Sequence, residues 1–215
     1  MERGLTPQEQ QFREEMRDFF TTKIPQDIRD KVAAGVELWD IPTDDLWCRD
    51  SGPSFVVNGK GVLAVTQFNF NGWGNKQAHR QDAHAPAIMA EAAGVPLVRA
   101  DICLEGGALE VDGRGNAILN ESCILNDNRN PGMSKAECEK ALARFLGIEH
   151  IIWLPGMKDA DITDSHIDFY AKYINGQTVL INREHNSTKP DHIITRETEA
   201  ALAELKSGMS FDQLV

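Results

Sequence analysis

NAILNESCIL (residues 116–125), NDNRNPG (126–132) and SKAECEKALARFL (134–146) are three consecutive segments with three different patterns. The first predicts a strand, and the second, which is rich in Asn, Pro and Gly, predicts a turn. The third predicts a helix with its first serine as the N-cap. Strands expected at Ala108 to Val111 and at His150 to Trp153 complete a strand-strand-helix-strand unit around this stretch.

The same kind of unit is predicted again on either side. The expected elements are strands at 62–70 and 97–102 around a helix at 79–93, then strands at 169–174 and 176–182 before a helix at 195–205. The three expected helices start near residues 79, 134 and 195, so their starts are 55 and 61 residues apart. Periods of this size are typical of radial or stacked arrays. The sequence therefore predicts an α/β protein built of repeated modules.

The first 35 residues have a different character. Thr6-Pro7-Gln8-Glu9 is a capping-box pattern, which predicts an amphipathic helix over residues 6–23. A proline ends that helix, and a second short helix is expected over residues 26–34. We therefore expect an N-terminal helical segment, 1–35, followed by a larger domain, 36–215.

Charge and composition disfavour several classes of protein. The 215 residues carry a formal net charge of -11, which argues against a nucleic acid partner and suits a small cationic substrate. No apolar run approaches the roughly 20 residues that span a bilayer, so we expect no membrane partner and a cytoplasmic location. The cysteines lack paired short spacings, so we expect reduced thiols at Cys48, Cys103, Cys123 and Cys138.

The first candidate site is Trp47-Cys48-Arg49-Asp50-Ser51-Gly52-Pro53. In an extended segment that meets a Gly-Pro turn, Asp50 would face a pocket and accept hydrogen bonds from a guanidinium. Trp47 would then form a flat wall for a planar cation. On spacing alone the commoner outcome is an ordinary surface ion pair of Arg49 and Asp50, with Trp47 in the core.

The second candidate is the acidic stretch from Asp161 to Asp168. Residues two apart share a face in an extended segment, so Asp164, His166 and Asp168 would converge on one pocket, where the imidazole could move protons. Spacing leaves two other readings open, a solvated acidic loop and a metal site with carboxylate and imidazole ligands.

A third candidate is Glu105-Gly106-Gly107, which follows a predicted strand. Paired glycines let a ligand or another segment of backbone come close, and Glu105 in that position can orient a histidine. By itself this tripeptide is more often a plain turn.

Taken together, the ordered motifs resemble the agmatine deiminase and bacterial-type peptidylarginine deiminase family over roughly residues 36–205. The matching stretches are Ile41-Pro42-Thr43-Asp44-Asp45, Trp47-x-Arg49-Asp50-Ser51-Gly52-Pro53, Phe70-Asn71-Gly72-Trp73-Gly74, Glu105-Gly106-Gly107-Ala108, Glu121-Ser122-Cys123, Asn128-Arg129-Asn130-Pro131-Gly132, Trp153-Leu154-Pro155-Gly156 and Asp161-x-Thr163-Asp164-x-His166-x-Asp168.

This resemblance implies a partial α/β propeller, pentein-like, with about three strand-strand-helix-strand modules around a central pocket. It also implies that two aspartates hold the guanidinium of the substrate, that a histidine is the general acid and base, and that a cysteine thiolate attacks the guanidinium carbon. No metal or organic cofactor is needed, and agmatine is the expected substrate, in putrescine biosynthesis. With the candidates above, the expected catalytic residues are His166 and Glu105, and the expected substrate-binding residues are Asp50, Asp168, Trp47 and Asp164.

Two departures from the family pattern accompany the matches. The family's nucleophile lies in a Cys-Gly-Gly-Gly segment, and no such segment occurs before Val215, so we expect an incomplete catalyst. Cys48 lies on the guanidinium-binding element beside a carboxylate, which disfavours a thiolate, so we do not expect it to substitute. In place of the family's first module, residues 5–32 resemble the opening helices of acyl-CoA dehydrogenases, without any flavin or acyl-CoA site.

Three functional hypotheses therefore follow. The leading one is an agmatine deiminase-like hydrolase, with peptidylarginine as an alternative substrate. The second is a module without catalytic activity that binds guanidinium compounds or self-associates through open sheet edges, as a homo-oligomer. The third is a metal-dependent hydrolase that uses Glu105, His166 and the aspartates.

Overall fold

The computed structural model describes most of the chain, namely residues 39–175, 178–205 and 213–214 and positions 7, 11 and 14. The chain divides into two compact units, Met1–Asp40 and Ile41–Val215, whereas the sequence placed a boundary after residue 35. The helices predicted over residues 6–23 and 26–34 lie outside the described residues except at those three positions, each of which is helical.

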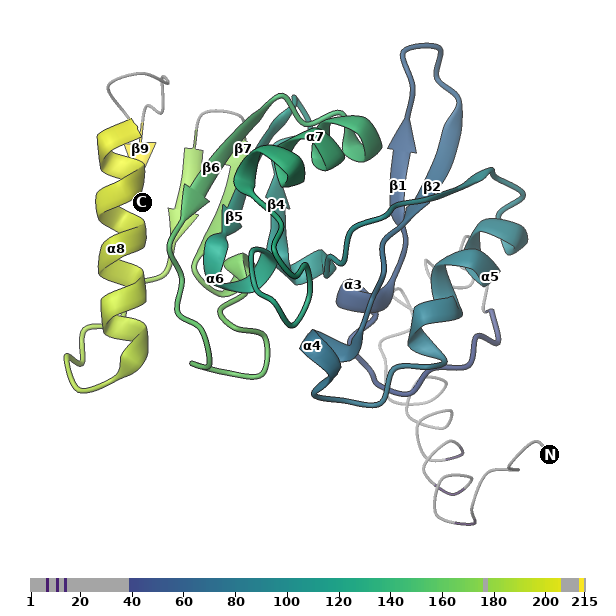
Figure 1. The fold of residues 1–215 in the computed structure, drawn as a ribbon, viewed down its shortest axis with the longest axis horizontal. Coiled ribbons are helices and arrows are strands. Elements are labelled where there is room, and N and C mark those ends of the chain that lie inside the picture. Colours follow the sequence, from purple (N-terminus) through teal and green to yellow (C-terminus); the bar gives the residue numbers. More distant parts are fainter. Residues whose placement is uncertain are drawn as a thin grey trace, which may run out of the picture. The chain divides into compact units, whose positions relative to one another are not determined.

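The described residues of the larger unit form three three-stranded sheets (Figure 1). In each sheet the first two strands are antiparallel, the last two are parallel, and a helix lies between the parallel strands in sequence. The elements are β1 (Ser54–Val57), β2 (Leu63–Gln67), α5 (Ala85–Ala92) and β3 (Leu97–Arg99); β4 (Leu109–Val111), β5 (Asn116–Asn120), α7 (Lys135–Leu146) and β6 (His150–Leu154); β7 (Ala171–Asn175), β8 (Thr178–Ile181), α8 (Pro190–Leu205) and β9 (Gln213–Leu214).

Short helical turns lie at the ends of several strands and carry much of the chemistry. They are α3 (Cys48–Ser51), α4 (Gly72–Asn75), η2 (Asp82–His84), η3 (Gly106–Ala108), α6 (Glu121–Ile124) and η4 (Ile167–Phe169). The mixed α/β class is thus confirmed. The arrangement of the modules around a central axis stays a prediction.

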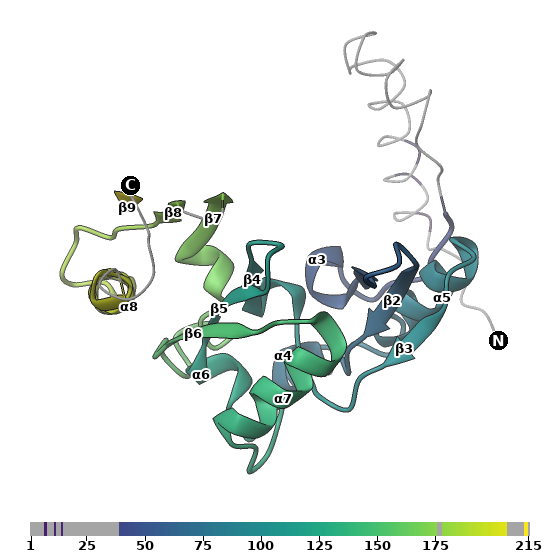
Figure 2. The same cartoon turned by 90° about the horizontal axis from the view of Figure 1, so that it is seen from above.

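The central sheet is buried on both of its faces. Side chains alternate along a strand, so Ala117 and Leu119 of β5 join one hydrophobic cluster and Ile118 joins another. The first cluster includes α7 and reaches Phe68 and Ile102, which follow β2 and β3, so it joins the first two sheets. The second includes α8, which lies beside the third sheet (Figure 2). Packing on both sides holds the strand ends, and the turns that follow them, in fixed positions.

Helix α7 begins and ends where its sequence predicts. Ser134 Oγ accepts a hydrogen bond from the Glu137 backbone N–H at 3.3 Å, and Glu137 Oε2 accepts one from the Ser134 N–H at 2.9 Å. These two bonds form a capping box. Gly147 ends the helix with a left-handed φ of 70°, which glycine adopts without strain.

We expect Ser134→Ala to lower the free energy of unfolding by about 1 kcal/mol, because the Glu137 backbone N–H at the helix start loses its acceptor, Ser134 Oγ. Urea denaturation followed by far-UV circular dichroism measures the change. Lys140→Ala, an exposed substitution on the same helix, is the matched control and should change stability by less than about 0.5 kcal/mol. Equal stability of the two variants would contradict the capping role.

Several elements and boundaries differ from the sequence expectations. Strand β1 was not predicted, because it has only four residues and its Phe55 and Val57 side chains are exposed. Residues 121–124 form α6 instead of extending β5, since Ser122 N–H donates to Pro155 O at 3.1 Å, a contact with a distant loop. Helices α5 and α8 begin at Ala85 and Pro190 rather than near 79 and 195. No helix among the described residues is both long and apolar enough to span a bilayer.

Candidate functional site

A cavity of about 240 Å³ collects most of the candidate residues. Its polar groups include the carboxylates of Asp50 and Asp168 and the imidazole of His166. Its aromatic groups are Trp47, Trp73 and Phe169. Carboxylates combined with flat aromatic walls suit a planar organic cation.

Asp50 is held rigidly from two sides. It lies on α3, where its Oδ1 accepts a hydrogen bond from the Gly107 N–H at 2.7 Å. Its Oδ2 accepts one from Trp73 Nε1 at 2.9 Å. Two donors of this kind fix the orientation of the carboxylate.

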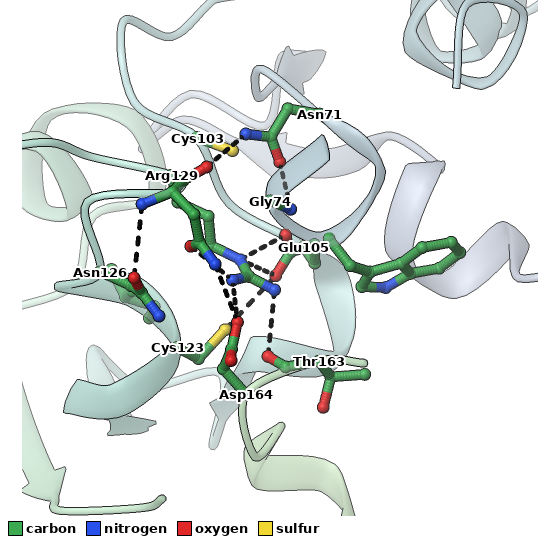
Figure 3. Close-up of polar contacts among 12 residues, drawn as sticks. Asn71, Gly74, Cys103, Glu105, Cys123, Asn126, Arg129, Thr163 and Asp164 are labelled. Atoms are coloured by element: carbon green, nitrogen blue, oxygen red, sulfur yellow. Dashed lines mark hydrogen bonds and ion pairs between the residues drawn. The ribbon is translucent and has the colours of Figure 1, made fainter. Parts of the chain in front are cut away.

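Trp73 reaches Asp50 because α4 has an unusual backbone. Trp73 itself has a φ of 56°, in the left-handed region that non-glycine residues seldom occupy. Asn71 Oδ1 accepts a hydrogen bond from the Gly74 N–H at 2.8 Å and fixes the turn (Figure 3). The ring of Phe70 packs edge-on against the indole at 5.1 Å. Such strain is typical of functional sites, where the surrounding structure enforces it.

Gly107 is the point at which the functional side chains meet. A Cβ at this position would lie 2.5 Å from His166 Nδ1. It would also lie 2.7 Å from Asp50 Oδ1 and 2.9 Å from Asp168 Oδ2. Only glycine leaves room for all three groups, which come from α3 and from the start of η4.

Glu105 orients the imidazole of His166. Its Oε2 lies 3.0 Å from His166 Nε2, and both side chains are buried. Burial alone would raise the pKa of Glu105, but the His166 hydrogen bond and the charge of Arg129 outweigh it, so the pKa lies below its usual value. An ionised Glu105 accepts a hydrogen bond from the Nε2–H group, and Nδ1 is then the ring nitrogen on the side of Asp50, 3.7 Å from Oδ1.

Arg129 is the centre of a buried ionic network that includes Glu105 and Asp164 (Figure 3). Its Nε lies 2.7 Å and 3.0 Å from the two oxygens of Glu105, and its Nη1 lies 2.6 Å from Asp164 Oδ2. Nη2 donates to the Thr163 carbonyl at 3.0 Å. The side chains of Arg129, Glu105 and Asp164 are fully buried. Three paired buried charges therefore hold Glu105, the partner of His166, in place.

Asp168 has weaker support than Asp50. Arg49 Nε lies 3.0 Å from its Oδ2, as an ion pair. Burial raises the pKa of Asp168, and the negative charge of Asp50 raises it further. The positive charges of His166 and Arg49 lower it, but the resulting pKa still lies above the usual value for an aspartate.

Among the residues that the structure describes, one group of side chains could hold a metal ion and so support a metal-dependent hydrolase. It consists of Glu105, Cys123 and His166. Both oxygens of Glu105 already accept from Arg129 Nε, whose positive charge would repel a metal ion. Burial, followed by the charge of Glu105, raises the pKa of Cys123 well above its usual value, which disfavours a thiolate ligand. The donor set therefore does not fit a metal ion.

Two local expectations from sequence were wrong. The Asp164 to Asp168 stretch is not extended, since Asp164 and Ser165 have left-handed φ values of 60° and 70° and η4 follows. The side chains of Asp164, His166 and Asp168 therefore do not share one face as they would in a strand. Asp164 lies in the buried network instead of facing the cavity, and its Oδ2 is 2.9 Å from Lys76 Nζ. The segment around Cys48 is helical rather than extended, and the exposed Cys48 is absent from the cavity wall that the described residues form.

The structure adds site residues that sequence reasoning missed. Trp73 and Arg129 lie in two of the motifs that carry the family resemblance, but neither residue was predicted to belong to the site. Gly107 was predicted to allow close approach of a ligand or of another segment of backbone, but the three side chains that surround it were not predicted. The exposed Phe169 was predicted to begin a strand. No local signal reveals these roles, because each depends on contacts with residues far along the chain.

Comparisons with known proteins identify the family to which the chain is similar. The chain matches the sequence profile of the Porphyromonas-type peptidyl-arginine deiminase family over residues 6–212, a range that takes in most of the segment resembling acyl-CoA dehydrogenases. It is 36% identical over 179 residues to an agmatine deiminase of Pseudomonas aeruginosa (strain LESB58), covering 80% of this chain and 48% of that protein. Over 164 residues it is 37% identical to an agmatine deiminase of Ectopseudomonas mendocina, a match that covers 73% of this chain and 44% of that protein.

Solved structures give the same result. The agmatine deiminase of Enterococcus faecalis superposes with a TM-score of 0.75 at 29% identity, covering 81% of this chain and 50% of that one. A cysteine-to-serine variant of C. jejuni agmatine deiminase with substrate bound gives 0.74 at 29% identity, covering 89% and 57%. The chain spans about half the length of the curated relatives it matches.

Proposed function

Because the chain belongs to the Porphyromonas-type peptidyl-arginine deiminase family, we propose that its larger unit binds a guanidinium group and supplies the acid–base chemistry of an agmatine deiminase-like hydrolase. The observation that carries this proposal is the meeting of Asp50, Asp168 and His166 around Gly107 in an aromatic-walled cavity. The three sheets would then form part of a propeller around that cavity.

The two carboxylates bind the guanidinium group. A guanidinium is planar, carries one positive charge and presents N–H donors in a fixed fork, which suits carboxylate acceptors. Asp50 is oriented by Trp73 and Gly107, so it needs no rearrangement when the ligand arrives. Trp47 and Phe169, both more than half exposed, cover the flat faces of the cation.

His166 moves the protons. Hydrolysis of a guanidinium C–N bond releases ammonia, and the departing nitrogen must gain a proton. His166 Nδ1, on the cavity side of the ring, gives that proton. With the cysteine thiolate that the family resemblance implies bonded to the guanidinium carbon, His166 then takes a proton from the water that hydrolyses this covalent adduct and releases the thiolate. Glu105 holds the ring by its other nitrogen throughout. None of the four cysteines lines the described cavity, so we assign none of them to the attack on the carbon.

Agmatine binding to the purified protein tests this proposal, by isothermal titration calorimetry. We expect wild-type binding and a loss of about 1.5 to 3 kcal/mol in Asp50→Asn, because an amide cannot replace a charged acceptor and would turn an N–H group toward Trp73 Nε1 or the Gly107 N–H. This corresponds to roughly tenfold to hundredfold weaker binding. Glu91→Gln, an exposed carboxylate on α5, is the matched control and should bind as the wild type does.

Further arms of the experiment separate the alternatives. Arginine and an arginine-containing peptide, titrated in the same way, distinguish a preference for agmatine from one for peptidylarginine. An assay for ureido product separates catalysis from binding without turnover, and gel filtration detects the self-association predicted for open sheet edges. Wild-type protein that binds no guanidinium ligand would refute the proposal, provided that circular dichroism shows it to be folded.

A further inference from the structure

The two carboxylates of the cavity are supported by different kinds of group. Asp50 accepts hydrogen bonds from an indole and a backbone amide. Asp168 has an ion pair with Arg49 Nε at 3.0 Å, and within the described part of the chain no hydrogen bond from a protein donor reaches it. The chain therefore presents its own guanidinium group to a carboxylate that, on the proposed function, also binds the guanidinium of the ligand.

Arg49 is itself held from behind. Its Nη2 lies 3.8 Å from Oε2 of Glu110, a buried carboxylate on β4. Glu110 is fixed in turn by the Tyr173 N–H at 3.0 Å and by Lys172 Nζ at 3.1 Å. The Arg49 guanidinium thus bridges a carboxylate of the cavity and a carboxylate of the neighbouring sheet.

The backbone of Arg49 is also closely packed. A Cβ at Gly106 would lie 1.9 Å from the Arg49 carbonyl oxygen, so α3 and η3 touch at this point. Such contact leaves α3 little freedom to shift. Arg49 lines the same cavity as Asp168, although about half of its side chain is exposed.

The reason that Asp168 needs a cation follows from its neighbours. Asp168 Oδ2 and Asp50 Oδ1 both lie within 3 Å of the position of a Cβ on Gly107, so two negative charges approach each other in a partly buried place. Like charges at this distance favour protonation of one carboxylate, and a nearby cation opposes it.

We propose that Arg49 is a positioning residue, which keeps Asp168 charged and correctly oriented beside Asp50 so that both carboxylates can bind a guanidinium ligand. This inference rests on the proposed function, because it assigns Arg49 a role in that same site. Arg49 pairs with Oδ2, which leaves Oδ1 of Asp168 for the ligand. The ligand then completes the neutralisation that Arg49 begins.

A pH dependence follows, with a defined sign. The groups that face Asp168 are Arg49 and Asp50 on α3, His166 before η4 and Lys172 on β7. Without the Arg49 charge, the pKa of Asp168 would rise further above its usual value. Ligand binding, which needs the charged carboxylate, is lost as pH falls through that pKa. In the variant this loss therefore begins at a higher pH than in the wild type.

The test is agmatine binding by calorimetry between pH 5 and 8, in wild type, Arg49→Gln and Arg49→Lys. An opposite charge at this distance shifts a carboxylate pKa by about 1 to 3 units. For Arg49→Gln we expect roughly tenfold weaker agmatine binding near neutral pH. We also expect the acid limb of the plot of affinity against pH, where binding is lost, to move to higher pH by about one unit. Arg49→Lys keeps the charge and should restore most of the affinity. Arg99→Gln, an exposed arginine on β3, is the matched control.

The outcomes separate this inference from the proposed function. Wild-type binding that Asp50→Asn weakens, together with an Arg49→Gln variant that matches wild type at every pH, would overturn the role of Arg49 alone. Tighter binding by Arg49→Gln would overturn it too, since Arg49 would then be a competitor. If Arg49→Gln does not fold, Glu110→Gln, which loosens the Arg49 guanidinium without removing it, should show a smaller upward displacement of the acid limb. A Glu110→Gln profile equal to that of wild type would refute the proposal.

Discussion

Replacing Arg129 by leucine is expected to lower the free energy of unfolding by about 3 to 5 kcal/mol, which is a large part of the total stability of a domain. The guanidinium of Arg129 is fully buried and pairs with Glu105 at 2.7 Å and Asp164 at 2.6 Å. Leucine would leave two buried carboxylates with fewer partners, and such uncompensated charge is among the costliest single changes in a protein.

Urea denaturation at neutral pH measures this effect. Arg129→Lys keeps the charge but cannot reach both carboxylates in a fork, so its stability should lie between those of the wild type and Arg129→Leu. The matched control is Lys189→Ala, which breaks an exposed ion pair with Glu184 (3.3 Å) and should cost less than about 1 kcal/mol. Similar costs for Arg129→Leu and Lys189→Ala would show that the buried network contributes no more than a surface pair.

This difference in stability should depend on pH in a known direction. Burial alone would raise the pKa of Asp164, but hydrogen bonds from Lys76 and other donors, including Arg129, lower it to about 2. A carboxylate with a lowered pKa contributes stability above its unfolded value, near 3.8, and loses it as pH falls toward 2. The part of the Arg129→Leu penalty that comes from Asp164 should therefore shrink over that range.

Gly107→Ala is expected to abolish measurable agmatine binding, a loss of at least about 3 kcal/mol or more than a hundredfold. The new methyl group would lie 2.5 Å from His166 Nδ1 and 2.7 Å from Asp50 Oδ1, both well inside contact distance. These side chains must move away, and they are the groups proposed to bind the ligand and to transfer protons. One added carbon atom thus disturbs both functions together.

Calorimetry with agmatine measures the loss, and thermal unfolding shows whether the variant still folds. Gly59→Ala is the matched control, because a Cβ at Gly59 meets no atom within 4 Å. We expect Gly59→Ala to bind agmatine as the wild type does. Wild-type affinity in Gly107→Ala would mean that the ligand does not use the carboxylates that meet at this glycine.

Local pattern alone predicted much of the order of elements. Helix α7 was predicted with its N-cap, because a capping box and a helical period lie within a few neighbouring residues. Strand β6 was predicted from a short apolar run, and the structure extends it by one residue, to Leu154. Strand β1 could not be predicted, since it has only four residues, of which Phe55 and Val57 have exposed apolar side chains, and it gains strand geometry by pairing with β2.

Some contacts of the candidate site could be predicted from the sequence, and others could not. The sequence singled out Asp50, Glu105, His166 and Asp168 from their motifs, and the fold brings all four together. It placed Asp164 with them by assuming an extended segment, and this was wrong because two left-handed residues turn the chain. The contact between Arg129 and Asp164 joins residues 35 positions apart, and no local pattern encodes such a pairing.

Sequence alone was therefore enough to identify the class of fold, the order of most elements and four of the residues that meet at the candidate site. These properties depend on periodicity, capping and chemical type, which neighbouring residues express without help from the rest of the chain. Tertiary structure decided which carboxylate faces the cavity, which lies in the buried network, and why Gly107 must be glycine. Those outcomes depend on distances of a few ångströms between segments far apart in sequence, and such distances arise only when the sheets pack.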